Sequence, residues 1–143
     1  MGIDTGINFV NVTLTELVFK LNKKFKLPKD GLPVEIDVQT KNSFSPDKKT
    51  LNAMLSVALF TKTRNRPFSM KVTVEGTFTG EDPAGLKRFS KVNAPAHLFP
   101  FVREVIGNTT MKANIPPLLL PPFNITAMVE IDKSKKVKRN GKQ

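Results

Sequence analysis

The sequence predicts an α+β domain, with strands in the first half of the chain and helices in the second. Apolar residues recur at every second position as far as residue 78, and at helical spacing after residue 83. Four successive strand segments are joined by polar connections, which favours an antiparallel meander. A chain of 143 residues forms one domain at roughly 100–200 residues per domain, which we assign to residues 1–132.

The first strand segment predicts one irregularity. Apolar residues fall on even positions from Val10 to Leu14, and on odd positions from Leu17 to Leu21. A shift of one residue turns the following side chains to the other face of a sheet. A β-bulge near Glu16 would therefore keep one face of this strand apolar.

The second and fourth strand segments alternate without a shift. Val34, Ile36 and Val38 share one face of the second segment. Apolar residues at even positions from Phe68 to Phe78 share one face of the fourth. Each of these strands is expected to turn its apolar face toward a core and its polar face toward water.

The third strand segment, residues 50–61, is apolar on both faces. Odd positions from Leu51 to Leu59 form one apolar face, and Met54, Ala58 and Phe60 stand on the other. Apolar side chains on both faces indicate that both faces are covered. In so small a chain, we expect a second subunit to cover Met54, Ala58 and Phe60 in a homo-oligomer.

Two helices follow. Asp82-Pro83 begins a short helix that runs through Phe89, because proline is tolerated in a first turn. Asn93 is a candidate N-cap for a second helix that ends at Gly107. Pro100 lies inside the helical pattern, so the helix either kinks there or begins later.

The C-terminal region divides into an apolar and a basic part. Residues 115–123 hold four prolines and five apolar residues, so we expect this segment to lie against an apolar surface. Residues 133–143 hold six of the 23 basic residues and no acidic one. This composition predicts a disordered basic tail that binds anions such as nucleic acid nonspecifically.

The sequence lacks the residues and motifs that most classes of enzyme use for catalysis. Without cysteine there is no disulfide, thiolate metal site or cysteine nucleophile, and His97 is the one imidazole. No P-loop, dinucleotide fingerprint or G-x-S-x-G elbow is present. We therefore expect no enzyme activity, no metal and no cofactor. With no continuous apolar run and no signal peptide pattern, we expect no membrane insertion and a cytoplasmic location.

Two classes of binding protein remain. The net charge of +11 is compatible with a basic nucleic-acid- or ribosome-binding protein, since many basic residues stand in loops. Apolar surface favours the other class. The segment 115–123, the two-sided third strand and eleven phenylalanines exceed the needs of one small core. This excess predicts a groove for extended apolar peptides.

Two blocks of sequence resemble the SecB family of protein-export chaperones. Residues 93–106, NAPAHLFPFVREVI, resemble the family's LFPYAREFI-type helix, and residues 115–125, IPPLLLPPFNI, resemble its FPQLNLAPVNF segment. Both follow four strand segments and Gly76-Thr-Phe-Thr-Gly80, which stands in place of the family's GIF strand end. The resemblance implies a four-stranded antiparallel sheet with helices on one face, assembled as a dimer of dimers.

The resemblance also implies the function. Members of this family are holdases that bind unfolded polypeptides, including preproteins, and can deliver them to the motor SecA. Acidic surfaces serve SecA docking in the best-known members, whereas this chain is basic, which favours another partner, including those of toxin–antitoxin pairs. We expect a client groove lined by side chains from the second helix and the proline-rich segment. These are Phe99, Phe101, Leu118, Leu119, Leu120, Phe123 and Ile125.

Overall fold

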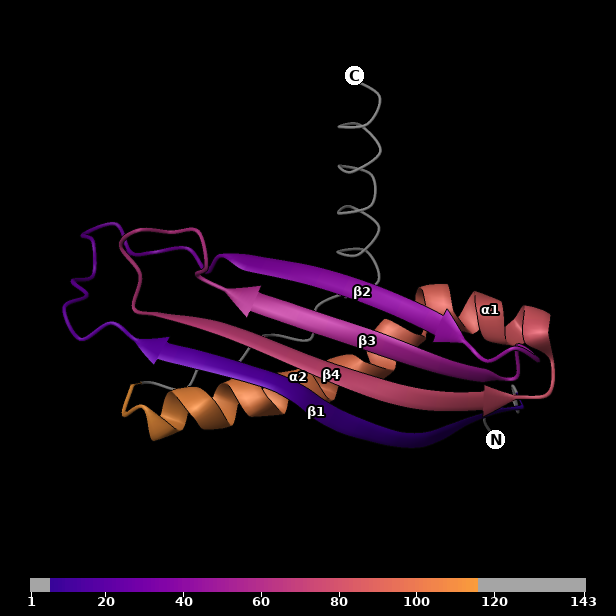
Figure 1. Cartoon of the computed structure of the whole chain (residues 1–143). Helices are drawn as coiled ribbons and strands as arrows, with labels where there is room; N and C mark the ends of the chain where they lie inside the picture. The colour runs from indigo at the N-terminus through magenta and orange to yellow at the C-terminus, as the bar shows by residue number, and fades with distance from the viewer. Residues whose placement is uncertain (1–5, 116–143) are drawn as a thin grey trace, which may run out of the picture.

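A four-stranded antiparallel sheet with two helices on one face forms the fold, which confirms the predicted class (Figure 1). The computed structural model describes residues 6–115. The elements are β1 (Ile7–Leu21), β2 (Ile36–Phe44), β3 (Thr50–Leu59), β4 (Phe68–Gly80), α1 (Pro83–Val92) and α2 (Ala94–Lys112).

The strand order is β1-β4-β3-β2, so the expected simple meander is wrong at the first connection. Strands β2, β3 and β4 follow one another as hairpins, whereas β1 pairs with β4 in a Greek-key arrangement. The connection 22–35 is long enough to cross the end of the sheet. It begins with Asn22 N–H, which donates to Pro67 O at 2.9 Å in the β3–β4 connection. Strands β1 and β2 are consequently the two edges.

The register of β1 against β4 shifts between Leu14 and Glu16, which confirms the predicted bulge. A second shift, between Phe9 and Asn11, was not predicted. Pairing of β2 with β3 and of β3 with β4 is continuous. The irregularities of this sheet therefore concentrate in β1, an edge strand, where bulges are most common.

The core lies between the sheet and the helices. Odd positions of β3 and even positions of β4 point toward the helices and are buried, as their alternation predicts. Gly76 of β4 gives α2 its close approach, because a Cβ there would lie 2.5 Å from Leu98 Cδ2. The core side chains contributed by α2 include Leu98, Val102 and Ile106.

The helices begin where the sequence predicts. Asp82 caps α1, and its Oδ1 accepts a hydrogen bond from Ala84 N–H at 3.2 Å. Asn93 precedes α2 but its side chain makes no capping bond. The second helix passes through Pro100 and continues to Lys112, so the predicted end at Gly107 is wrong. Gly107 is buried inside α2 and does not end the helix.

Candidate functional site

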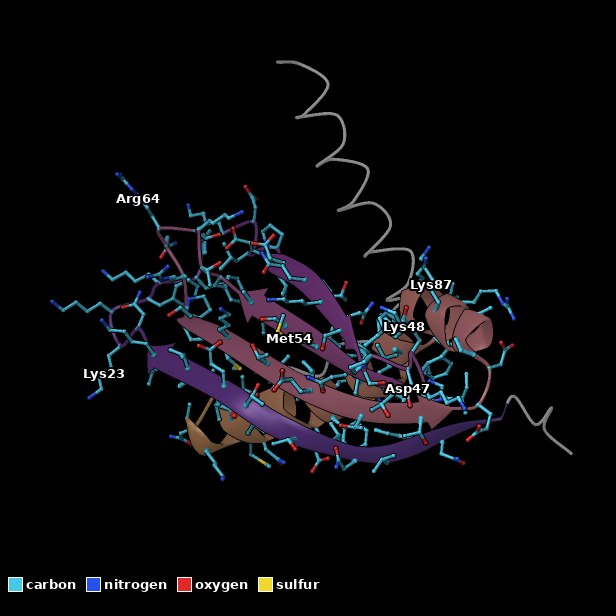
Figure 2. All side chains as sticks on the ribbon, turned by 45° about the vertical axis from the view of Figure 1, so that its right-hand side comes forward. Lys23, Asp47, Lys48, Met54, Arg64 and Lys87 are labelled. Carbon is cyan, nitrogen blue, oxygen red and sulfur yellow. The ribbon has the colours of Figure 1, made fainter. Side chains whose placement is uncertain are left out.

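The sheet face opposite the helices carries two of the three residues expected at a subunit interface. Met54 lies on this open face, visible in Figure 2, and Ala58 shares it. Phe60 does not. It lies one residue beyond β3 with a positive φ of 53°, and its ring packs edge-on against Phe68 with centroids 5.2 Å apart. Only 4% exposed, Phe60 belongs to the core, because the strand alternation ends at Leu59.

The rest of the open face is mainly polar. Thr73 Oγ1 lies within hydrogen-bonding distance of Ser56 Oγ at 2.9 Å and Glu16 Oε1 at 3.3 Å. Lys71 Nζ pairs with the same Glu16 oxygen at 3.3 Å. Polar groups on one face of an antiparallel sheet normally face water. Met54 is therefore a partly exposed apolar residue in a polar surface, and not the centre of an apolar patch.

Exposed apolar surface concentrates instead on β1. This strand holds five of the ten exposed large apolar side chains found among residues 6–115. They are Phe9, Val10, Leu14, Leu17 and Val18, each between 39% and 55% exposed. An edge strand with this much exposed apolar surface is a template for contact with another chain.

Three of these side chains lie on the helix-covered side of the sheet. Phe9, Leu14 and Leu17 pair in register with Phe78, Val74 and Val72, which are core residues of β4. They remain exposed because α2 packs mainly over β4 and β3. The helix layer thus stops short of β1 and leaves its inner side chains uncovered.

Phe101 of α2 borders the same surface. Its ring meets Phe9 edge-on with centroids 5.9 Å apart, while Phe9 stacks on Phe78 at 4.8 Å. Phe101 is 37% exposed, whereas Phe99 is buried. We name the exposed set Phe9, Leu14, Leu17 and Phe101 the β1/α2 apolar surface.

Most of the side chains predicted to line the groove lie outside the described residues. Leu118, Leu119, Leu120, Phe123 and Ile125 are outside the described residues, so of the seven predicted side chains the structure describes Phe99 and Phe101. The exposed apolar side chains of β1 were not predicted, although the sequence carries a signal for them. Two adjacent apolar pairs, at positions 9–10 and 17–18, place apolar side chains on both sides of one strand.

His97 is exposed on α2, and its ring lies against phenylalanine rings. Its Nδ1 lies 3.0 Å from Asn93 O, one turn earlier in α2. Its ring also lies 5.3 Å from Phe89 and 6.1 Å from Phe78, between centroids. In residues 6–115 no three His, Cys, Asp or Glu side chains are grouped as a metal would require.

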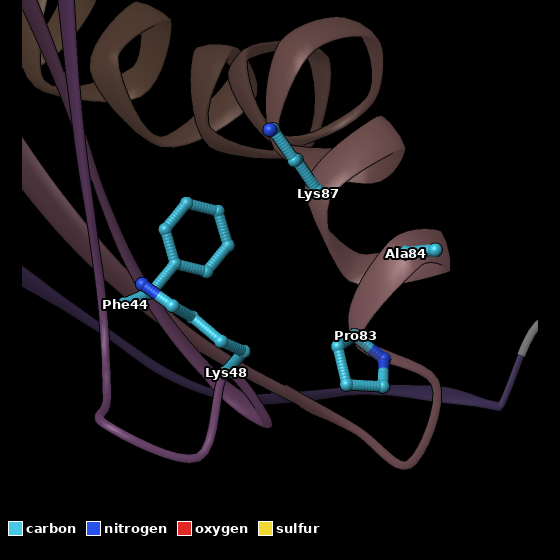
Figure 3. A pocket seen from close by; sticks show the side chains of 5 residues that line it. All are labelled: Phe44, Lys48, Pro83, Ala84 and Lys87. Atoms are coloured by element: carbon cyan, nitrogen blue, oxygen red, sulfur yellow. The ribbon is translucent and has the colours of Figure 1, made fainter.

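A small pocket lies between the β2–β3 hairpin and the start of α1 (Figure 3). It has a volume of about 330 Å³ and is lined by Phe44, Lys48, Pro83, Ala84 and Lys87. Lys48 Nζ stands 5.9 Å from the centre of the Phe44 ring. The apolar wall and two ammonium groups suit a single apolar group next to an anion, but the pocket is too small for an extended polypeptide.

Two carboxylates are held in their charged form by hydrogen bonds at the ends of the sheet. Backbone N–H groups of Lys62 and Thr63 donate to Glu35 Oε1, at 2.9 and 3.3 Å, and lower the pKa of Glu35. The Ser45 hydroxyl donates to Asp47 Oδ1 at 2.6 Å and lowers the pKa of Asp47. Glu35 thus holds the β3–β4 connection by hydrogen bonds, and Asp47 holds the β2–β3 turn. Neither carboxylate lies on the β1/α2 apolar surface.

Comparison with known proteins gives a family. The family model described as "Preprotein translocase subunit SecB" matches residues 16–136, most of the chain. An uncharacterized protein of Methanocaldococcus jannaschii, MJ0357, is 28% identical over 131 residues, which cover 87% of this chain and 83% of that protein. The protein-export protein SecB of Halorhodospira halophila is 27% identical over 112 residues, covering 76% of this chain and 65% of that protein.

A solved structure shares the fold. The SecB-like chaperone Rv1957 of Mycobacterium tuberculosis, in complex with a ChAD peptide from the HigA1 antitoxin, matches with a TM-score of 0.66. The match covers 82% of this chain and 90% of the other at 16% identity, which shows a common fold. None of the described helices is long and apolar enough to cross a membrane. Since the family match spans most of its length, this chain belongs to the SecB family of protein-export chaperones.

Proposed function

We propose that this SecB-family chaperone holds non-native polypeptides on the β1/α2 apolar surface. The observation that carries the proposal is the row of exposed side chains on one edge strand, beside a helix that leaves them uncovered. Soluble monomers rarely expose a contiguous apolar patch unless it binds something. An unfolded polypeptide offers the matching chemistry, because it exposes the apolar side chains that a folded protein buries.

The geometry of β1 suits an extended client. Its 15 residues span about 50 Å at a rise of about 3.4 Å per residue. Apolar burial supplies the attraction at about 25 cal/mol per Å² without selecting a sequence, and client binding should persist in high salt. Leu118, Leu119, Leu120, Phe123 and Ile125 remain predicted members of the same surface.

A double substitution tests the proposal. Leu14→Ser with Leu17→Ser should abolish most aggregation suppression of an unfolded apolar client at high salt. The matched control is Val92→Ser with Met111→Ser, which removes apolar side chains that are 50% and 57% exposed on the helices. The control should suppress aggregation as well as the parent chain. Equal loss in both variants, with unchanged unfolding midpoints, would place client binding elsewhere.

We further propose that a second copy of the chain pairs along the free edge of β1. Val10 and Val18 are 55% and 53% exposed, and an apolar edge strand favours pairing with another chain. Pairing two β1 strands would join two β1/α2 apolar surfaces into one longer client surface. A dimer is the minimum assembly expected, and a dimer of dimers follows if the family pattern holds.

Light scattering distinguishes this edge from the open face predicted first. Val18→Lys should shift the assembly toward monomer, since a charge is costly in an apolar contact. Gln39→Lys places the same charge on the other edge, β2, and should leave the assembly intact. Dissociation by Met54→Lys but not by Val18→Lys would instead support the interface predicted at Met54 and Ala58.

The delivery partner is proposed from charge. With a net charge of +11, the chain lacks the acidic balance that docking on SecA uses in the family, so we propose a different partner in the cytoplasm. Titration of labelled chain with SecA should give no saturable binding at physiological salt. Saturable binding would restore SecA as the partner.

A further inference from the structure

Two connections meet at one end of the sheet and are tied to each other. They are residues 22–35, between β1 and β2, and residues 60–67, between β3 and β4 (Figure 1). Asn22 N–H donates to Pro67 O at 2.9 Å, and Asn22 Nδ2 donates to Arg66 O at 2.8 Å. Asn65 Nδ2 donates to Lys26 O at 3.3 Å. We name these two connections together the basic end.

The basic end holds seven basic residues and only two acidic ones. The basic residues are Lys23, Lys24, Lys26, Lys29, Lys62, Arg64 and Arg66. Figure 2 shows Lys23 and Arg64 extending away from the sheet. By contrast, the turns 45–49 and 81–82 at the other end hold two basic and three acidic residues. With Lys87, Arg88 and Lys91 of α1, the other end holds five basic and three acidic residues, so its net charge is +2 against +5 at the basic end.

Carboxylates leave most of this positive charge uncompensated. Among residues 6–115, the basic end shows one ion pair, between Lys62 Nζ and Asp37 Oδ2 at 3.4 Å. Glu35 is committed to the backbone N–H groups of Lys62 and Thr63. Arg66 Nη1 donates to the carbonyl oxygens of Phe60 and Thr61. The lysines of residues 23–29 remain available to an external anion.

An apolar side chain stands among these lysines. Leu27 is 70% exposed, more than any other large apolar side chain of residues 6–115. It lies between Lys26 and Lys29 in the sequence. An exposed leucine flanked in the sequence by lysines combines the two interactions that hold peripheral proteins on a membrane. These are attraction to anionic headgroups and shallow insertion of an apolar side chain.

We propose that the basic end docks the protein on an anionic phospholipid surface. The exposed apolar residue decides between a membrane and RNA. Single-stranded nucleic acid is bound by aromatic rings that stack on bases. In residues 22–35 the exposed large apolar side chains, Leu27 and Val34, are aliphatic, and the aromatic ring of Phe25 is partly buried. The basic end also consists of loops that project beyond the sheet (Figure 1). A deformable lipid surface can contact such loops without a matching cavity. This docking does not depend on client holding.

The experiment is sedimentation of the full chain with vesicles. Vesicles of phosphatidylglycerol and phosphatidylcholine should bind the chain, and pure phosphatidylcholine vesicles should bind it far less. Lys23→Gln, Lys24→Gln and Lys26→Gln together should weaken binding about 100-fold, at about fivefold per cation. Leu27→Ser should weaken vesicle binding severalfold but leave binding of single-stranded RNA unchanged.

The matched control removes the same charge from other parts of the fold. Lys41→Gln, Lys48→Gln and Lys87→Gln together should keep most vesicle binding, since these exposed lysines lie outside the basic end. An equal loss in the two triple variants would overturn the proposal, because net charge alone would then explain it. The proposal also fails if Leu27→Ser binds vesicles like the parent chain, or if the basic end is needed for RNA but not for vesicles.

Discussion

The two edges of the sheet differ in length, regularity and cover. Strand β1 has 15 residues, two register shifts and five exposed large apolar side chains. Strand β2 has nine residues in continuous register, and its Val38 is buried. Asn42 of β2 also donates to Ser90 O of α1 at 3.3 Å. Strand β2 thus has a hydrogen bond to α1 and no exposed large apolar side chain, whereas β1 leaves five of them exposed.

This difference separates stability from binding in the fold. Apolar side chains under the helices form the core, whereas the five exposed ones on β1 are expected to contribute less to stability because they stay about half-exposed. Natural sheets usually protect an edge strand with charges or with a covering element. Strand β1 carries only two charged residues, Glu16 and Lys20, against five exposed large apolar side chains. Such an edge is a surface where another chain can bind, which is the role we propose for β1.

The largest expected effect on stability is a difference between two leucines, one buried and one exposed. Leu98→Ala removes a buried side chain of α2 and should lower the free energy of unfolding by about 2–5 kcal/mol. Leu14→Ala removes a side chain that is 46% exposed and should cost about 1 kcal/mol. Urea denaturation of both variants measures the difference. Similar losses would mean that β1 is part of the core.

The sequence predicts which side chains are apolar more reliably than which are covered. Alternation in residues 50–59 and 68–78 correctly identified the core faces, and the shift near Glu16 correctly identified a bulge. The same alternation cannot tell that the helix layer ends before β1, because this depends on where α2 crosses the sheet. It also gave β1 the wrong neighbour, since pairing with β4 depends on a long connection.

Phe60 and Gly107 show a second limit of patterns. Each was interpreted from its place in a repeat or from its residue type: Phe60 by extending the alternation of β3, and Gly107 as a helix terminator. Phe60 has a positive φ and is buried in the core, and α2 continues through the buried Gly107 to Lys112. The family resemblance supplied the helix layer on one face, which composition and periodicity do not specify.

An intermediate effect is expected where α2 meets the sheet. A Cβ at position 76 would lie 2.5 Å from Leu98 Cδ2 and 3.2 Å from the Phe78 ring, and both side chains are buried. Gly76→Ala should therefore displace α2 and cost about 1–3 kcal/mol, measured by urea denaturation. Gly31→Ala is not a suitable control, because Gly31 has a positive φ of 79°. Thr77→Ser, at the next position on the open face, should change stability little.

The smallest expected effect on stability concerns the hydrogen bonds that join each edge strand to the β3–β4 connection. The carboxylate of Glu35, just before β2, accepts hydrogen bonds from Lys62 and Thr63, whereas the amide of Asn22, just after β1, has no titratable group. Because the pKa of Glu35 is lowered by folding, its contribution is fully present above its ordinary pKa of 4.5. That contribution disappears as the pH falls through the lowered value.

Glu35→Gln should therefore reduce the unfolding midpoint slightly at pH 7, and the difference from the parent chain should shrink as the solution is acidified below pH 4.5. Asn22→Ala should show a deficit that stays constant over the same range, since the bonds it removes do not titrate. A Glu35→Gln deficit that persists unchanged in acid would show that the carboxylate charge does not fasten the β2 edge.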